Sequence, residues 1–111
     1  MHLKNWSIGY PDGRNARIAP LYDFVCTRLY YPNAELALTI GGERQFGGVD
    51  ADAMRTFARA AEISVRRTLV LASELVERLH DTWRTFRDTV PDPNLIAAIE
   101  RNFGVTPLMR T

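Results

Sequence analysis

The length of 111 residues predicts one small domain with a single hydrophobic core. Fourteen Lys and Arg against thirteen Asp and Glu leave a net charge of +1, so charge alone favours neither nucleic acid nor an anionic membrane as a partner. The apolar runs are far shorter than the roughly 20 residues that cross a bilayer, and no signal pattern opens the chain, which predicts a cytoplasmic protein. The single cysteine, Cys26, cannot form an internal disulfide, and we expect it to be a buried or inert thiol.

The N-terminal part of the chain predicts a β-hairpin. Residues 6–10 and 16–19 flank the turn sequence Pro11-Asp12-Gly13-Arg14, in which Pro presets the bend and Gly tolerates positive φ. From residue 20 to residue 48 we expect irregular structure. One exception is a short strand or helical turn over 36–40, which ends at a Gly-Gly pair.

A helical period begins near residue 49. Asp50 or Asp52 can cap a first helix that ends near Glu62, and Ser64 can cap a much longer one. The apolar residues of the longer helix are spaced 4,3,4,3,4,3,4 and are Val65, Leu69, Ala72, Val76, Leu79, Trp83, Phe86 and Val90. This spacing predicts a buried seam on a helix of about 25 residues, roughly 38 Å long. Leu71 and Leu75 should widen the seam toward the core.

Asp92 and Pro93 predict the start of a last helix that stops at Gly104, with an apolar side. That side consists of Leu95, Ile96, Ile99 and Phe103. The fold class is therefore mainly α, with a small N-terminal β-hairpin, a long loop and three helices. We expect a single domain, 1–111, in which residues 1–48 hold the hairpin and site loops and residues 49–104 hold the helices.

Two polar residues flank the predicted hairpin in a pattern that suggests phosphotransfer chemistry. Asn5 precedes the hairpin and Asp23 follows it, eighteen positions later. A carboxamide and a carboxylate are oxygen ligands suited to Mg²⁺, which in protein kinases also binds ATP phosphates. Folding of the hairpin should bring the two side chains together. Taken singly, each residue has a structural explanation as a turn former or cap.

The segments around these residues resemble the C-terminal half of the HipA family, the serine/threonine kinase toxins of bacterial toxin–antitoxin systems. The resemblance rests on residues 1–7 (MHLKNWS) and 18–23 (IAPLYD), and residues 35–42 (ELALTIGG) and the terminal helices also suit the family. The family motif reads Asp-x-His-x-Lys-Asn followed by an aromatic residue and Ser. Its Asp, the catalytic base, would stand immediately before Met1.

The resemblance implies that Asn5 and Asp23 bind Mg²⁺, and that His2 and Lys4 face phosphate or brace the loop. It implies Mg²⁺ and ATP as cofactors of a complete kinase. Without the base and the nucleotide-gripping N-terminal lobe, we expect these 111 residues to be inactive alone and to bind neither cofactor appreciably. The implied partners are the N-terminal lobe, a protein substrate and an antitoxin protein.

Three aromatic residues near the site and one histidine have simpler explanations. Trp6, Tyr22 and Phe24 are expected to pack under the hairpin. His80 lies off the apolar seam of the long helix and is expected to be a solvated surface residue.

Two other classes of function remain open. Residues 57–67 resemble a helix-turn-helix DNA reader, with Ser64, Arg66 and Arg67 at the start of its second helix. Against this stand Glu62 where Gly is common, the length of the second helix, and a chain that is not basic. The other alternative is a fragment that folds and interacts with proteins without catalysis.

Overall fold

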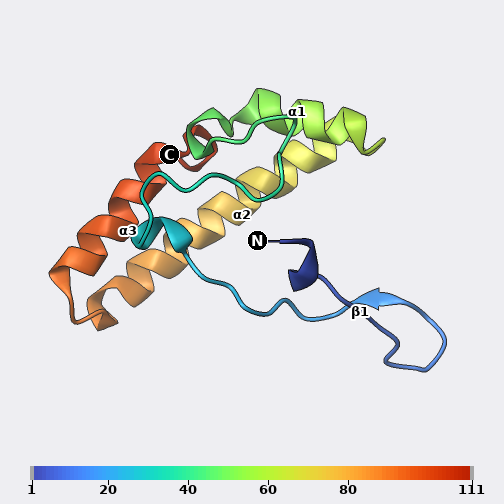
Figure 1. Ribbon diagram of the computed structural model, residues 1–111, viewed down its shortest axis with the longest axis horizontal. Coiled ribbons are helices and arrows are strands. Elements are labelled where there is room, and N and C mark those ends of the chain that lie inside the picture. Colours follow the sequence, from blue (N-terminus) through green and yellow to red (C-terminus); the bar gives the residue numbers. More distant parts are fainter. Residues whose placement is uncertain (1, 111) are drawn as a thin grey trace.

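The computed structural model describes residues 2–110 and has the predicted fold class: a two-stranded hairpin followed by a loop and three α-helices (Figure 1). The α-helices are α1 (Ala51–Ala60), α2 (Val65–Phe86) and α3 (Pro93–Val105), and the strands are β1 (Ile8–Gly9) and β2 (Arg17–Ile18). Short 3₁₀ turns are η1 (Leu3–Asn5), η2 (Thr27–Leu29), η3 (Phe46–Gly48), η4 (Arg87–Thr89) and η5 (Pro107–Met109).

The hairpin forms where its turn sequence predicts, with shorter strands. Ile8 pairs with Ile18 in an antiparallel register. Asp12 Oδ1 accepts hydrogen bonds from the backbone N–H groups of Arg14, at 3.0 Å, and Asn15, at 2.8 Å. Figure 1 shows the hairpin as an arm that projects away from the helices.

The strand or helical turn predicted over 36–40 does not form. This part of the chain has only an isolated bridge between Ile40 and Glu43, together with a hydrogen bond from Leu36 N to Arg44 O at 2.9 Å. Gly41 is required at the bend because its φ is +60° and a Cβ there would collide with the backbone of Ala53 in α1.

Each α-helix begins at the polar residue that the sequence predicts as its cap. The capping hydrogen bonds run to Asp50 from Ala53 N, to Ser64 from Arg67 N, and to Asp92 from Asn94 N. Helix α1 ends at Ala60 and α3 at Val105, both close to the predicted limits. Helix α2 is shorter than predicted, with 22 residues, because the chain tightens into η4 after Phe86 and leaves Val90 outside it.

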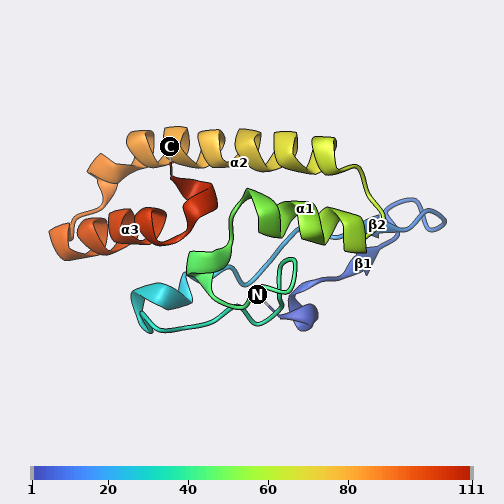
Figure 2. The ribbon, with the colours of Figure 1, turned by 90° about the horizontal axis from the view of Figure 1, so that it is seen from above.

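Helices α1 and α3 lie on the same side of α2, and the loops and N-terminal segment lie beyond them (Figure 2). The core is small: the buried hydrophobic residues among 2–110 are Val49, Ala53 and Ala58. The seam predicted on α2 is half-buried and not buried: Val65, Leu69, Ala72, Val76 and Trp83 are half-buried, while Leu79 and Phe86 are exposed. Leu71 and Leu75 do not widen a core either; both are exposed because no described element covers that side of the helix.

Several predictions for single side chains were also wrong. Trp6, Tyr22 and Phe24 are exposed, because the projecting hairpin has nothing packed over them. Cys26 is exposed, so it is not a buried thiol, while its inertness stays a prediction. His80 is partly buried: its Nε2 lies 2.8 Å from Met109 O and its ring centroid lies 5.0 Å from that of Phe103. The period of α2 could not reveal this contact, because it depends on α3 and η5 folding back.

None of the helices in residues 2–110 combines the length and apolar character needed to span a membrane.

Candidate functional site

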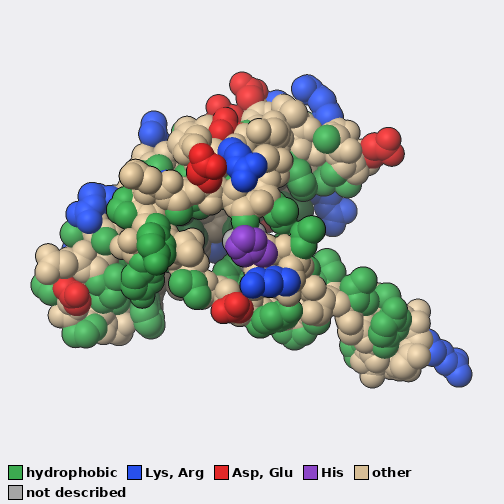
Figure 3. Space-filling view, viewed as in Figure 1, with side chains coloured by type: hydrophobic (Ala, Val, Ile, Leu, Met, Phe, Trp, Pro, Cys, Tyr) green, Lys and Arg blue, Asp and Glu red, His purple; other side chains and the backbone are tan. Residues whose placement is uncertain are grey.

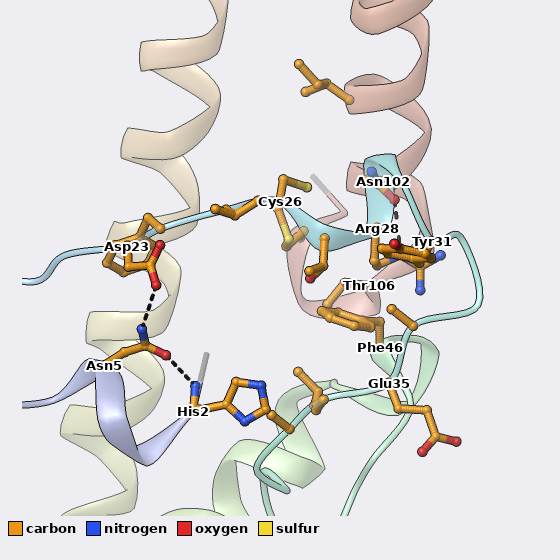
Figure 4. A pocket seen from close by; sticks show the side chains of 18 of the residues that line it. His2, Asn5, Asp23, Cys26, Arg28, Tyr31, Glu35, Phe46, Asn102 and Thr106 are labelled. Carbon is orange, nitrogen blue, oxygen red and sulfur yellow. Dashed lines mark hydrogen bonds between the residues drawn. The ribbon is translucent and has the colours of Figure 1, made fainter.

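Asn5 and Asp23 meet beside the hairpin. Asn5 ends η1, and Asp23 lies in the extended segment that follows β2 (Figure 4). The Asn5 Nδ2 group donates a hydrogen bond to Asp23 Oδ2 at 3.5 Å. The two side chains are therefore in contact although they are eighteen positions apart in the sequence, as hairpin closure predicts.

Hydrogen bonds beyond the strands hold the two ends of the hairpin together. The Tyr22 hydroxyl donates to Lys4 O at 2.7 Å, and Ser7 Oγ lies 3.2 Å from the same hydroxyl. Ala19 N donates to Ser7 O at 2.9 Å. Because Lys4 precedes Asn5 and Tyr22 precedes Asp23, these bonds set the distance between the two candidate ligands.

The two candidate ligands have different surroundings. Asn5 is 6% exposed, and its Oδ1 accepts a hydrogen bond from His2 N at 2.8 Å. Asp23 is exposed and its backbone has φ +58°, a left-handed conformation that is uncommon for residues other than Gly. Such strain occurs where surrounding contacts enforce it, and it is frequent at ligand-binding sites.

The pair fits a cation that prefers oxygen ligands. The Asp23 carboxylate supplies oxygen directly, while Asn5 turns its amino group to the carboxylate and its oxygen to His2 N. Rotation of the Asn5 amide would place two oxygens side by side, an arrangement that a cation between them stabilises. This rotation breaks two hydrogen bonds, the long one to Asp23 Oδ2 at 3.5 Å and the one from His2 N at 2.8 Å, so the bound cation must offset the loss of the second.

A cavity of about 980 Å³ opens next to the pair and extends toward α3. His2 and Lys4 line it together with Asn5 and Asp23. On the far side, Arg28 donates from Nε to Asn102 Oδ1 at 3.1 Å and lies over the Phe46 ring at 5.0 Å from its centroid. Figure 4 shows His2, Asn5 and Asp23 on one side of the open space and Arg28, Phe46 and Asn102 on the other.

Sequence reasoning missed the roles of Tyr22 and Arg28. Continuing the antiparallel register from the Ile8–Ile18 pair puts Tyr22 opposite Lys4, so the register could have identified that contact. Nothing local could have identified the contact of Arg28 with Asn102, because 74 positions separate the two residues.

Two carboxyl groups with shifted pKa values lie on other parts of the molecule. The pKa of Asp12 is lowered to about 2 by hydrogen bonds from the backbone N–H groups of Asn15 and Arg14 in the hairpin turn. The pKa of Glu100 on α3 is lowered by a hydrogen bond from Arg87, whose Nε is 2.7 Å from Glu100 Oε1. Asp12 stabilises the hairpin turn, and the contact of Glu100 with Arg87 links α3 to η4.

The chain belongs to the HipA-like C-terminal domain family, whose family model matches residues 1–83. The matched region contains Asn5, Asp23 and the hairpin between them, and it runs from η1 into α2. The resemblance seen in the N-terminal motifs is thus confirmed at the level of the family.

Two curated proteins of Sinorhizobium fredii (strain NBRC 101917 / NGR234) are similar to this chain. The protein named "Putative kinase Y4dM" is 33% identical over 92 residues, which are 82% of this chain and 22% of that protein. The protein named "Putative kinase Y4mE" is 38% identical over 66 residues, which are 58% of this chain and 15% of that protein. The chain therefore spans only about a fifth or less of the length of these relatives. No solved structure gives a significant match to it.

Proposed function

We propose that the chain forms part of the C-terminal lobe of a HipA-type serine/threonine protein kinase, with Asn5 and Asp23 as its Mg²⁺ ligands. The observation that carries the proposal is the direct contact of these two side chains across the hairpin, at 3.5 Å. Membership of the HipA-like family and the similarity to proteins named as kinases support it.

In this proposal each residue near the pair has a separate task. Asn5 and Asp23 supply one oxygen ligand each, which suits Mg²⁺ because it usually takes few ligands from protein and the rest from phosphates and water. Bound Mg²⁺ would neutralise charge on the ATP phosphates. His2 and Lys4, which line the same cavity as the pair, would contact phosphate. Tyr22 keeps the two ligands in register through its bond to Lys4 O.

The protein substrate, and an antitoxin if the parent is a toxin, would bind the whole kinase. We assign no catalytic base to residues 2–110. Loss of general-base assistance alone typically lowers a rate by 10²- to 10⁴-fold, and poor positioning of the nucleotide lowers it further. We therefore expect the isolated chain to incorporate no measurable phosphate from ATP.

No contact at the site specifically supports either alternative function, the DNA reader or the fragment that only interacts with proteins. As a DNA reader, α2 would be an unusually long recognition helix of 22 residues, and the preceding turn holds Glu62 at φ +55°. A fragment that only interacts with proteins would have the same fold but no need for the strained Asp23 beside Asn5.

A chimeric kinase tests the proposal. The matched 92-residue segment of the relative named Y4dM is replaced by this chain, and phosphorylation is followed with labelled ATP and Mg²⁺. Asp23→Asn should lower the rate at least 100-fold, and Asn5→Ala at least 10-fold. The matched control Asp88→Asn, at an exposed position in η4 away from the hairpin, should leave the rate unchanged. Equal activity of the Asp23→Asn and Asp88→Asn chimeras would refute the assignment.

A further inference from the structure

The described part of the chain exposes more surface than a compact protein of its mass. Its accessible area is 8608 Å² for a 12.6 kDa chain. A folded monomer of this mass exposes roughly 6,200 Å² by the usual scaling. The radius of gyration is 15.9 Å, whereas about 13 Å is typical for this length. About 2,400 Å² of the surface is therefore in excess.

Part of this excess is a row of apolar side chains on α2, interrupted by Thr82 before its last member. We call Leu71, Leu75, Leu79 and Phe86 the α2 stripe; they are 52%, 65%, 41% and 59% exposed. At 3.6 residues per turn, their positions fall within an arc of about 80° on the helix. Four large side chains exposed along one arc form a patch of the kind that marks an interaction site.

The α2 stripe meets the cavity beside Asn5 and Asp23. Leu79 belongs to the stripe and also lines the cavity. The cavity walls add Phe24, Val25 and Tyr31, each more than 60% exposed. Figure 3 shows that hydrophobic side chains are also exposed over the hairpin and over the helical end of the molecule. The stripe and the cavity thus form one apolar surface that reaches the candidate metal ligands.

We propose that the α2 stripe and the cavity together bind an apolar helix from the remaining polypeptide of the kinase. The choice of this occupant rests on the proposed function. The curated relatives are more than four times as long as the segment they share with this chain, so in them such polypeptide exists. An interface that covered about 2,400 Å² of this chain and a similar area of its partner would bury roughly 4,800 Å² in total, within the range of obligate interfaces, 2,000 to 5,000 Å². The cavity volume of about 980 Å³ corresponds to roughly two turns of a helix 10–12 Å in diameter.

A second copy of the chain fits this surface less well. In a symmetric dimer the same patch faces itself, so the α2 stripe of one copy could lie against the stripe of the other. The concave cavity would then face a second cavity and stay unfilled. A helix supplied by another part of the kinase fills the cavity and covers the stripe at the same time.

Binding in trans tests the proposal. The probe is the Y4dM polypeptide that lacks its matched 92-residue segment. Only a preparation that rebinds this segment, added as a separate polypeptide, is used. Titration calorimetry measures its affinity for the full 111-residue chain in the absence of ATP and Mg²⁺, which makes the result independent of the kinase chemistry. Leu75→Glu places a charge in the stripe. Ser73→Glu is the control, because it places the same charge on an exposed position of α2 two residues away and outside the arc.

We expect the wild-type chain and Ser73→Glu to bind the probe, and Leu75→Glu to bind at least 10-fold more weakly. Fluorescence of the apolar dye ANS should be high for the chain alone and should fall when the probe is added. Equal binding by Leu75→Glu and Ser73→Glu would overturn the proposal, as would no binding of the wild type. A dimer of the chain in light scattering that Leu75→Glu dissociates would overturn it in favour of a second copy.

Discussion

The hydroxyl of Tyr22 donates a hydrogen bond to the carbonyl oxygen of Lys4 at 2.7 Å, and each of these residues directly precedes a candidate metal ligand. The bond closes the hairpin at its open end, where the two-residue strands β1 and β2 no longer pair. The distance between Asn5 and Asp23 therefore depends on a tyrosine that itself contributes nothing to the chemistry.

Removal of this hydroxyl should loosen the site. Tyr22→Phe keeps the ring but leaves Lys4 O without its donor, so we expect a loss of about 0.5 to 1.5 kcal/mol in the free energy of unfolding. In the chimeric kinase the affinity for Mg²⁺ and ATP should also fall. The control is Tyr10→Phe, at an exposed position of the hairpin. Similar urea melts and affinities for the two variants would contradict the role given to Tyr22.

Helix α2 should be stabilised by its partly buried side and not by the α2 stripe. Trp83 is partly buried and lies edge-on to Phe103 at 6.2 Å between ring centroids, so Trp83→Ala should cost about 1.5 to 3 kcal/mol, less than a full core position. Leu75→Ala should change stability by less than about 0.5 kcal/mol in the isolated chain, because Leu75 is exposed. Equal urea midpoints for Trp83→Ala and Leu75→Ala would contradict the claim that the partly buried side of α2, and not the α2 stripe, stabilises the helix.

The bend before α1 provides a test of backbone packing. Gly41 and Gly42 both have positive φ, at +60° and +84°, so an Ala at either position strains the backbone. Only at position 41 would a Cβ also meet the backbone of Ala53, whereas position 42 has open space. Thermal melts should show Gly41→Ala to be less stable than Gly42→Ala by more than about 1 kcal/mol. The reverse order would show that α1 does not approach this bend.

The hairpin turn should weaken in acid. Its Asp12 carboxyl has a pKa lowered from 3.8 to about 2 by backbone N–H donors, so the stabilisation is complete above pH 3.8 and is lost as the pH falls through about 2. Carbon-13 NMR of the carboxyl should give a midpoint near 2. Asn15→Ala, which removes one side-chain donor at 2.6 Å, should raise the midpoint partway toward 3.8. A wild-type midpoint at 3.8 would mean that the turn is not formed in solution.

The success of the sequence predictions depended on how local each feature is. The Asp12 turn and the caps at Asp50, Ser64 and Asp92 were predictable because each depends on residues two or three positions away. The contact of Asn5 with Asp23 was predictable once a hairpin was placed between them.

The side of α2 that packs was predictable, but the degree and width of its burial were not. A 4,3 spacing identifies an apolar face, but burial requires another element to cover it, and in residues 2–110 none covers Leu71 or Leu75. His80 was misassigned for a similar reason, since its partners Phe103 and Met109 come from α3 and η5. Packing between distant segments leaves no local pattern in the chain.

The most direct test of the central claim is paramagnetic relaxation by Mn²⁺, which replaces Mg²⁺ at oxygen sites and is detected even when binding is weak. Nitrogen-15-labelled chain is titrated with Mn²⁺ and ATP, and line broadening is mapped by residue. We predict strongest broadening at the Asn5 side-chain amide and the backbone of Asp23, with Asp23→Asn abolishing it and the control Asp88→Asn, at an exposed position in η4, leaving it intact. Broadening that is centred elsewhere, or that persists in Asp23→Asn, would contradict the metal site.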